Sequence, residues 1–543
     1  MINCSIRDRI AGILDDYLRQ KSIDNHSFEV LRPDTPKHGD YSSNIAMGLA
    51  GKLKMPPRKI AEEIIESIDK TMFSRVEIAG PGFINFFLAG DVFVQWLRHA
   101  LNDDFGRWDI GDEKKIQVEF VSANPTGPVT VANGRGAPLG DSIARLLEWT
   151  GHYVSREFYV NDRGAKIDNL AYSLEERFKQ AHNLEWNIPE EGYPGEYLLD
   201  IAVEIKMEYG TIPLEMDDES RHQFFRKEAT SRIIKWQRDV FSRFGINFDV
   251  WFSEKKMVET GEIEDAIARL KERGMLYEED GATWMRSTDL GDDKDFVIIK
   301  SNGDATYTAT DIAYHINKFN RGFDHVIDVM GADHHGHIGP MKAGLEALAY
   351  HKDKLEFHLY QLVHLFKDGK QVKMSKSSGE FITLEELLDE VGVDVSRYFY
   401  LMRTSDTHLN FDIDQAKSKS MDNPAYYVQY AYVRCNAITS DERAGDADIS
   451  NVSVFTEDAE LNLIREIITL PDVIISASNA RAPNRITQFA EKVAGAFHHF
   501  YHKCRVLDES DEIRNKRLLL VKATRCVLKS ALSVLGVSAP EKM

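Results

Sequence analysis

The chain has 543 residues, of which 43% are hydrophobic and 28% are charged, and its formal net charge at pH 7 is −20. This length exceeds what one hydrophobic core supports, so several domains are expected. The negative charge excludes promiscuous nucleic-acid binding, because affinity for polyanions depends on phosphate neutralisation by Lys and Arg. No apolar run reaches the roughly 20 residues of a membrane helix. The four cysteines are scattered without metal-ligand spacing, so we expect a cytoplasmic protein without structural zinc.

In chain order, residues 1–111 mix helical periodicity with the strand-like run VEIAGPGFINFFL and are expected to form an N-terminal α+β domain. The short strand-forming run IQVEFV follows, then a glycine-rich turn, a helical face and a second strand, YVSREFYV. Strand, turn, helix and strand make a βαβ unit of the doubly wound kind. The pattern therefore predicts a multidomain α/β protein with a Rossmann-like, parallel-sheet domain over residues 112–414. Within it, a charged and mostly helical segment at about 169–292 is expected to be an insertion, and residues 415–543 are expected to be an all-α bundle.

The glycine-rich turn NPTGPVTVANGRGAPLGD, residues 124–141, opens the first helix of this domain. Such a turn presents unpaired backbone N–H groups and the positive end of the helix dipole, which suit a phosphate. Its glycines lack the GxGxxG spacing of the dinucleotide fingerprint. Nucleotide binding and close packing of helix on strand both remain open.

Two polar segments contain side chains that can bind a phosphate, a metal ion or a substrate. Lys373 and Lys376 stand three apart in the polar loop GKQVKMSKSSGEF, where they can close over a polyphosphate, although a solvated surface loop has the same composition. Asp333, His334, His335 and His337 follow the strand-like run HVIDVMG. Metal binding is one interpretation of these four residues, but contacts to a ribose or substrate fit a strand end better.

Aromatic residues mark two further candidates. Tyr307 and Asp311 stand four apart and share one face if their segment is helical, and a carboxylate beside an aromatic ring suits a guanidinium or ammonium group. An Asp at a helix start is the alternative explanation. Tyr426, Tyr427 and Tyr430 fit either core packing or stacking on unpaired bases.

In this order the segments resemble class I aminoacyl-tRNA synthetases, and within that class the bacterial arginyl-tRNA synthetases. HGDYSSNIAMGLAGKL is similar to the family's extra N-terminal tRNA-binding domain, VEFVSANPTGP and KMSKSSGEFITLEELLDEVG to its catalytic domain, and DNPAYYVQYAYVR to its anticodon-binding domain. The resemblance implies that L-arginine is activated by ATP with Mg²⁺ and transferred to the terminal adenosine of tRNA(Arg). It also implies a monomer.

The resemblance implies residue roles as well. The catalytic positions are Lys373, Lys376, Thr130 and Asn133. The ATP-binding positions are Thr130, Ala132, Asn133, Gly331, Asp333, His334, Met374, Ser375 and Lys376. The arginine-binding positions are Glu119, Ser122, Asn124, Tyr307, Asp311 and His335. The positions expected to bind tRNA are Phe83, Asn85, Tyr426, Tyr427 and Tyr430.

The chain departs from the family at its signature turn, which normally reads HxGH and here reads TVAN from Thr130 to Asn133. Thr and Asn can still donate hydrogen bonds to phosphate oxygens, but without positive charge. The methyl group of Ala132 can crowd an adenine base that glycine would admit. Two hypotheses follow: a working synthetase with a tolerated variant turn, or a paralogue that binds tRNA or regulates without activating arginine. The first is favoured because the lysine loop and the pair Tyr307 and Asp311 are retained.

Overall fold

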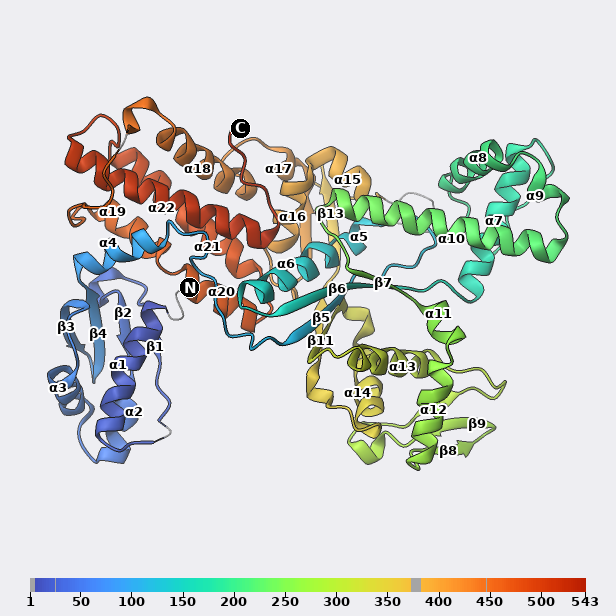
Figure 1. The fold of residues 1–543 in the computed structure, drawn as a ribbon, viewed down its shortest axis with the longest axis horizontal. Coiled ribbons are helices and arrows are strands. Elements are labelled where there is room, and N and C mark those ends of the chain that lie inside the picture. The colour runs from blue at the N-terminus through green and yellow to red at the C-terminus, as the bar shows by residue number, and fades with distance from the viewer. Residues whose placement is uncertain (1–4, 25, 373–381, 446) are drawn as a thin grey trace. The chain divides into compact units, whose positions relative to one another are not determined.

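The computed structural model describes residues 5–24, 26–372, 382–445 and 447–543. The chain forms two compact units, each described here by itself (Figure 1). The first unit comprises Met1–Ile110, Trp149–Gly151 and Lys419–Met543, and the second comprises Gly111–Glu148 and His152–Ser418. Within the described ranges, no helix is both long enough and apolar enough to cross a membrane.

The second unit is built on a five-stranded parallel sheet with the strand order β12-β11-β5-β6-β7. Its strands are β5 (Lys115–Phe120), β6 (Tyr153–Val160), β7 (Val250–Ser253), β11 (His325–Gly331) and β12 (Leu355–Tyr360). From β5 the chain adds β6 and β7 on one side, and it later adds β11 and β12 on the other. The order therefore reverses between β5 and β11, and ligands of such sheets bind outside the carboxyl ends of the strands at that point.

Helix α6 (Gly136–Trp149) packs against β5 through a glycine. A Cβ atom at Gly140 would lie 2.2 Å from Cγ of Phe120, a distance at which neither group could stay in place. Phe120 is itself almost fully buried. Close packing therefore accounts for Gly140, whatever the rest of the glycine-rich turn binds.

Between β6 and β7 the chain forms a separate group of helices, which we call the α7–α10 lobe. Its helices are α7 (Ala165–Ala181), α8 (Tyr197–Tyr209), α9 (Ile212–Glu215) and α10 (Asp218–Arg243). The lobe has its own apolar core, which includes Leu170, Phe178 and Phe225. The long helix α10 runs from the tip of the lobe back to the main sheet (Figure 1). Strand β7, which lies inside the segment expected to be an insertion, pairs with β6 and belongs to the main sheet.

The rest of the second unit covers the other face of the sheet and its edge. After β7 come α11 (Glu254–Glu259), α12 (Glu262–Glu272) and a small antiparallel sheet of β8 (Leu276–Glu279), β9 (Ala282–Met285) and β10 (Phe296–Ile299). Helices α13 (Tyr307–Asn320) and α14 (Ile338–Ala347) flank β11. Tyr307 and Asp311 both lie on α13, so the condition under which they share one helical face is met.

A third sheet and three helices complete this unit. The sheet contains β13 (Val363–Lys367), β14 (Lys370–Gln371) and β15 (Leu409–Asp412), and the helices are α15 (Leu384–Val391), α16 (Val393–Leu401) and α17 (Ile413–Lys417). Asp368 and Gly369 connect β13 to β14 with φ of +52° and +68°, as an Asp-Gly hairpin turn requires. Thr383 and Glu386 form a capping box that opens α15. The lysine loop falls on residues 373–381, outside the described residues.

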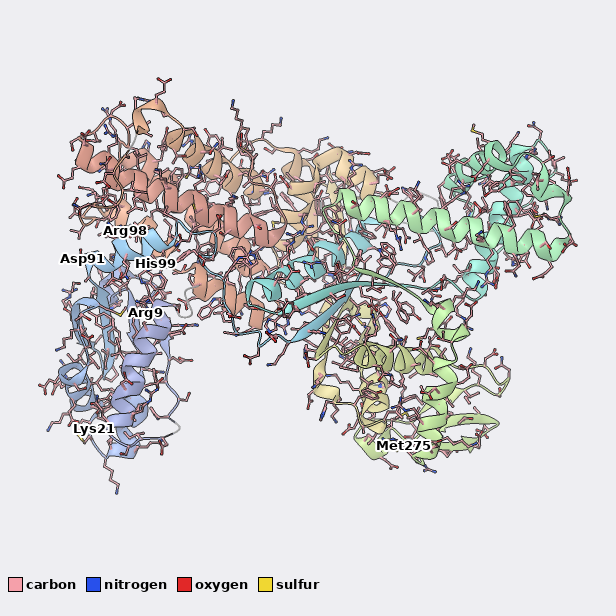
Figure 2. All side chains as sticks on the ribbon, viewed as in Figure 1. Arg9, Lys21, Asp91, Arg98, His99 and Met275 are labelled. Carbon is pink, nitrogen blue, oxygen red and sulfur yellow. The ribbon has the colours of Figure 1, made fainter. Side chains whose placement is uncertain are left out.

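The first unit combines a four-stranded sheet with two groups of helices. The sheet contains β1 (Val30–Leu31), β2 (Tyr41–Ser43), β3 (Phe73–Ala79) and β4 (Phe83–Leu88), beside α1 (Ile6–Gln20), α2 (Ile45–Leu53), α3 (Pro57–Ser67) and α4 (Gly90–His99). The guanidinium of Arg9 on α1 lies 5.5 Å from the ring centre of Trp96 on α4, close to His99 (Figure 2). The later group contains α18 (Pro424–Thr439), α19 (Asp458–Ile467), α20 (Leu470–Asn479), α21 (Asn484–Lys503) and α22 (Asp511–Leu535). The predicted fold class is confirmed, including the helical C-terminal part.

Replacing Gly140 by Ala should lower the free energy of unfolding by about 1–3 kcal/mol, because the added methyl group must displace Phe120 or α6. Gly12 on α1 is the matched control, since nothing lies within 4 Å of a Cβ atom built there. Gly12→Ala should be neutral or stabilising. Thermal and urea unfolding of the two variants would measure the difference, and equal stabilities would contradict the packing role of Gly140.

Candidate functional site

The carboxyl end of β5 turns sharply at two residues with left-handed backbone. Val121 has a φ of +69° and Ser122 has a φ of +42°. A positive φ is strained for a β-branched residue such as Val121. The turn brings the hydroxyl of Ser122 within 2.8 Å of Oε1 of Glu119, to which it donates. The same hydroxyl oxygen accepts the backbone N–H of Tyr159 at 3.0 Å. Glu119 and Ser122, both predicted to bind arginine, are therefore held together beside the point where the strand order reverses.

Three carboxylates stand in one row across the sheet, and we call them the acidic row. Asp328 on β11 is in register with Glu119 on β5, and Glu119 is in register with Glu157 on β6. Neighbouring strands lie about 4.8 Å apart, so like charges directly opposite one another repel. Glu157 is fully buried and Asp328 is 2% exposed, which leaves little water to screen them. Cations of the protein must compensate this row.

Helix α13 supplies the cation at the centre of the acidic row. Lys318 is fully buried, and its Nζ donates to Oε2 of Glu119 at 2.6 Å and to Oδ1 of Asp328 at 2.7 Å. His315 lies one turn earlier on α13, with its Nε2 2.6 Å from Oδ2 of Asp328. Burial favours the protonated form of Asp328, but Lys318 and His315 together hold its pKa well below the usual range.

Glu157, at the other end of the acidic row, has its own partners on α13. Arg321 donates to both of its carboxylate oxygens, at 2.6 and 2.8 Å, and the hydroxyl of Tyr314 donates at 2.7 Å. Burial by itself would raise the pKa of Glu157. The hydrogen bonds from Arg321 and the charge of Lys318 outweigh burial and lower this pKa.

Two further carboxylates, Asp311 on α13 and Glu254 at the start of α11, face the same region. Burial raises the pKa of Asp311 to about 7, and the negative charges of Glu119 and Glu254 act in the same direction. Glu254 is 5% exposed, and burial raises its pKa although the hydroxyl of Tyr159 donates to it. Lys318 and Arg321 are already committed to the acidic row, and Glu254 has only a longer ion pair, with Nη1 of Arg163 3.9 Å from its Oε1. Such a site suits a cationic ligand with several N–H donors, as a guanidinium has.

The TVAN turn forms the short helix α5 (Val131–Gly134), and Thr130 caps it. The hydroxyl of Thr130 accepts the backbone N–H of Asn133 at 3.4 Å and donates to its Oδ1 at 2.7 Å. The hydroxyl of Tyr400 donates to the carbonyl of Val131 at 3.0 Å. Thr130 and Asn133 are thus in direct contact at the start of a helix, and Ala132 lies between them.

The TVAN turn is also joined to the start of α15. Thr130 pairs with Thr383 in an antiparallel bridge, and the N–H of Leu384 donates to the carbonyl of Val129 at 2.8 Å. The lysine loop directly precedes α15 in the chain. Its four residues that were predicted to bind ATP or to act in catalysis lie outside the described residues: Lys373, Met374, Ser375 and Lys376.

The remaining predicted residues of this unit are open to solvent. Gly331 ends β11, and Asp333, His334 and His335 are exposed on the 3₁₀ helix η3 (Ala332–His337) that follows. Tyr307 is 70% exposed at the first position of α13. Asn124 is exposed as well, and its backbone carbonyl accepts a hydrogen bond from Gln237 at 3.1 Å. Hydrogen bonds hold Glu119 to Ser122 and Thr130 to Asn133. Exposed to solvent instead are Asn124, Tyr307, Asp333, His334 and His335.

The residues predicted to bind tRNA lie in the first unit and differ in exposure. Phe83 is 40% exposed at the start of β4, whereas Asn85 is 5% exposed and its Oδ1 accepts the hydroxyl of Ser42 at 2.8 Å. The burial of Asn85 and its hydrogen bond with Ser42 indicate that this residue contributes to packing within the sheet.

On α18, Tyr426 and Tyr430 stack with ring centres 5.8 Å apart and planes 16° apart. The guanidinium of Arg434 lies 4.4 Å from the ring centre of Tyr430. Tyr427 packs against His498, with ring centres 4.8 Å apart. Two stacked rings beside a guanidinium can receive an unpaired base.

The sequence did not lead us to predict that Glu254 and Lys318 belong to the site. Glu254 follows directly on a four-residue strand, so recognising VWFS as a strand would have placed a carboxylate at its carboxyl end. Lys318 lies seven residues after Asp311 on the same helical face, among buried residues. A lysine at a core position of a helix was the available signal, because such a lysine needs a buried anion.

Three family models match consecutive parts of the chain. The model described as "tRNA synthetases class I (R), catalytic domain" matches residues 97–408. "Arginyl tRNA synthetase N terminal domain" matches residues 3–88, and "DALR anticodon binding domain" matches residues 428–543.

Full-length relatives are also found. The arginine–tRNA ligase of Listeria monocytogenes serovar 1/2a is 45% identical over 519 residues, which is 94% of this chain and 93% of that protein. The arginine–tRNA ligase of Desulforamulus reducens is 44% identical over 98% of this chain and 97% of that protein. The crystal structure of Thermus thermophilus arginyl-tRNA synthetase has the same fold, with a TM-score of 0.78 and 23% identity over 99% of this chain and 100% of that one.

Replacing Lys318 by Met should lower the free energy of unfolding by about 3–5 kcal/mol, because it leaves Glu119 and Asp328 buried without their cation. Adding Asp328→Asn should restore part of the loss, since one buried charge then disappears. Lys271→Met, at an exposed position of α12, is the matched control. Urea unfolding measures all three, and a Lys318 variant as stable as the control would contradict the role of this lysine.

Proposed function

The chain belongs to the arginyl-tRNA synthetase family and is an arginine–tRNA ligase, and on that premise we propose how its residues divide the reaction. L-arginine is activated by ATP to arginyl-adenylate, and the arginyl group is then transferred to the terminal adenosine of tRNA(Arg). The observation that carries the assignment of residues is the excess of carboxylates at Asp311 and Glu254 beside the acidic row. A paralogue without activation chemistry is not favoured, because the similarity to arginine–tRNA ligases extends over nearly the full chain.

The guanidinium of arginine is assigned to Asp311 and Glu254. Both carboxylates lie within electrostatic range of each other, and a guanidinium can donate to both at once. The exposed ring of Tyr307, one turn before Asp311, can cover the bound side chain at the entrance. Glu119 and Ser122, held by Lys318 and by their own hydrogen bond, face the amino-acid end of the ligand together with Asn124. His335, which follows the carboxyl end of the neighbouring strand β11, is assigned to the arginine side chain.

ATP enters as its magnesium complex at the point where the strand order reverses. Gly331, Asp333 and His334 follow β11, and the TVAN turn follows β5, so the two can flank one nucleotide. A carboxylate oxygen of arginine attacks the α-phosphorus, the bond between the α-phosphorus and the bridging oxygen breaks, and pyrophosphate leaves. Such a displacement needs positioning and charge stabilisation. Lys373 and Lys376 are proposed to supply the positive charge, with Met374 and Ser375 beside the nucleotide.

The TVAN turn is proposed to be a working variant of the signature. Because the hydroxyl of Thr130 donates to Oδ1 of Asn133, the amide Nδ2 of Asn133 remains to donate to a phosphate oxygen. Neutral donors replace charged ones in this arrangement, so more of the charge stabilisation falls to the lysine loop. Ala132 has a methyl group where the family has glycine, and the nucleotide base must accommodate it.

The first unit is proposed to bind tRNA(Arg). Phe83 at the start of β4 and the stacked pair Tyr426 and Tyr430 offer aromatic surface for unpaired bases. In the second step, a ribose hydroxyl of the terminal adenosine attacks the arginyl carbonyl and AMP leaves. A cytoplasmic location and a monomeric state stay predictions.

Aminoacylation tests the function directly. Purified protein is incubated with bacterial tRNA, Mg-ATP and labelled arginine, with the other amino acids as parallel controls. Charging with arginine alone is the expected result. Measurable tRNA binding without any charging would overturn the proposal in favour of the paralogue.

The apparent KM for arginine should fall as pH rises from 6 to about 7.5 and then level off. Below its pKa of about 7, Asp311 is protonated and must lose a proton before it can bind a guanidinium. The dependence can reach about tenfold per pH unit well below that pKa. Steady-state charging between pH 6 and pH 8.5 measures it.

Asp311→Asn supplies the control for the pH dependence. It should raise the KM for arginine about tenfold or more, on the scale of a charged hydrogen bond, and it should flatten the profile between pH 6 and 7.5. Glu264→Gln, at an exposed position of α12, should change neither. A pH dependence that survives in the Asp311 variant would assign the titration to another group.

A further inference from the structure

Side chains of the α7–α10 lobe bind the backbone of the loop that connects β5 to the TVAN turn. Nε2 of Gln237 on α10 donates to the carbonyl of Asn124 at 3.1 Å and to that of Gly127 at 3.0 Å. The hydroxyl of Tyr197, the first residue of α8, donates to the carbonyl of Thr126 at 2.7 Å. This loop has no regular secondary structure, so its carbonyls depend on such partners. Three of its four carbonyls between residues 124 and 127 are bound by the lobe.

Hydrogen bonding to the loop, more than packing, accounts for a glutamine at position 237. Its side chain is 1% exposed, and Oε1 has no hydrogen-bond partner within the described part of the chain. An unpartnered buried oxygen costs free energy, so apolar packing alone would favour a residue such as Met or Leu here. The gain that offsets this cost is the pair of hydrogen bonds to the loop. Tyr197 fits its place equally closely, because a Cβ atom at Gly127 would lie 3.1 Å from its hydroxyl.

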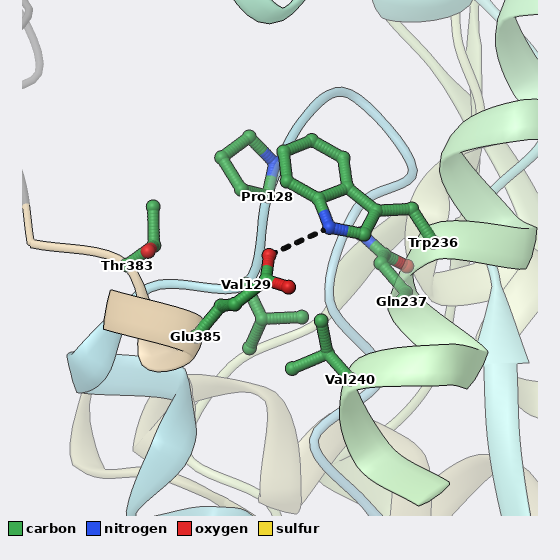
Figure 3. A pocket seen from close by; sticks show the side chains of 7 residues that line it. All are labelled: Pro128, Val129, Trp236, Gln237, Val240, Thr383 and Glu385. Carbon is green, nitrogen blue, oxygen red and sulfur yellow. Dashed lines mark hydrogen bonds between the residues drawn. The ribbon is translucent and has the colours of Figure 1, made fainter. Parts of the chain in front are cut away.

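The neighbouring residue on α10 reaches the other end of the same loop. Nε1 of Trp236 donates to Oε2 of Glu385, in the first turn of α15, at 3.0 Å (Figure 3). Figure 3 shows Trp236 and Gln237 side by side against Pro128 and Val129. Two turns later on α10, Arg243 forms an ion pair with Asp389 of α15. Helix α15 in turn donates the N–H of Leu384 to the carbonyl of Val129.

We propose that Gln237, Tyr197 and Trp236 are positioning residues for arginine activation, through which the α7–α10 lobe sets the loop from Asn124 to Thr130. Gln237 and Tyr197 fix the half of the loop that carries Asn124, which faces arginine. Trp236 fixes α15, and α15 fixes the half that ends at Thr130. The inference rests on the proposed function, because the roles of Asn124 and Thr130 come from it. In this proposal the lobe acts on the reaction through the loop and α15.

The first test separates the two halves of the loop. Gln237→Met keeps the volume of the side chain and removes its donor, and it should raise the KM for arginine about five- to tenfold, with the KM for ATP within twofold. Tyr197→Phe removes a single hydroxyl and should raise the KM for arginine about threefold. Gln223→Met on the exposed face of α10 and Tyr172→Phe on α7 are the matched controls and should leave both values unchanged.

Trp236→Phe tests the other half. It keeps an aromatic ring and removes the N–H donated to Glu385, so it should lower kcat several-fold and leave the KM for arginine within twofold. Trp186→Phe, at an exposed position of the lobe, is its control. A Trp236 variant with the kcat of this control would contradict the link through α15.

A double-mutant cycle distinguishes positioning from a general loss of stability. If Gln237 acts through the side chain of Asn124, then Gln237→Met should add almost nothing to the KM for arginine when Asn124 is already Ala. Its effect on the melting temperature should persist in that background. Independent effects on KM would overturn the proposal, as would a Gln237 variant identical to its control. Tyr197→Phe carries the same cycle if the Gln237 variant does not fold. Wild-type protein that fails to charge arginine would contradict the proposed function itself and not this inference alone.

Discussion

The acidic row of Asp328, Glu119 and Glu157 is the constraint on which the placement of the other site residues depends. Three carboxylates on neighbouring strands cannot be buried without cations, so α13 must cross this face of the sheet with Lys318 and Arg321 toward it. Once α13 lies there, Asp311, two turns earlier on the same face, is placed close to Glu119 and Glu254. The ion pairs that neutralise the acidic row therefore also determine the position of Asp311, the carboxylate proposed to bind arginine.

The parts of the fold that follow from local signals could be predicted from the sequence. Strand β5, helix α6 and strand β6 were predicted from hydrophobic periodicity. Tyr307 and Asp311 were predicted on one helical face because four residues make about one turn. The roles of the site residues came from a family resemblance, and they stay predictions because residue chemistry alone left alternatives open.

The parts that depend on distant segments could not be predicted. Glu254 and Gln237 gain their significance from partners more than fifty residues away in the chain, at Asp311 and Asn124. Strand β7 has only four residues, and its membership of the main sheet depends on pairing with β6 after a long helical excursion. Asn85 was expected to bind tRNA, but it is 5% exposed and accepts a hydrogen bond from Ser42 on another strand. No periodicity within a short window records such pairings.

The surplus of carboxylates beside the acidic row also bears on translational fidelity. A neutral analogue with the shape of arginine, such as a ureido amino acid, would offer no cation to Asp311 and Glu254, the carboxylates proposed to bind the guanidinium. A compact ammonium, as in lysine, could not donate to both carboxylates with the fork geometry of a guanidinium. A site built around buried polar groups rejects ligands that leave them unpaired, on the order of 10⁴- to 10⁵-fold in known cases. If Asp311 and Glu254 bind the guanidinium as proposed, discrimination of this size requires no second site that hydrolyses the wrong product.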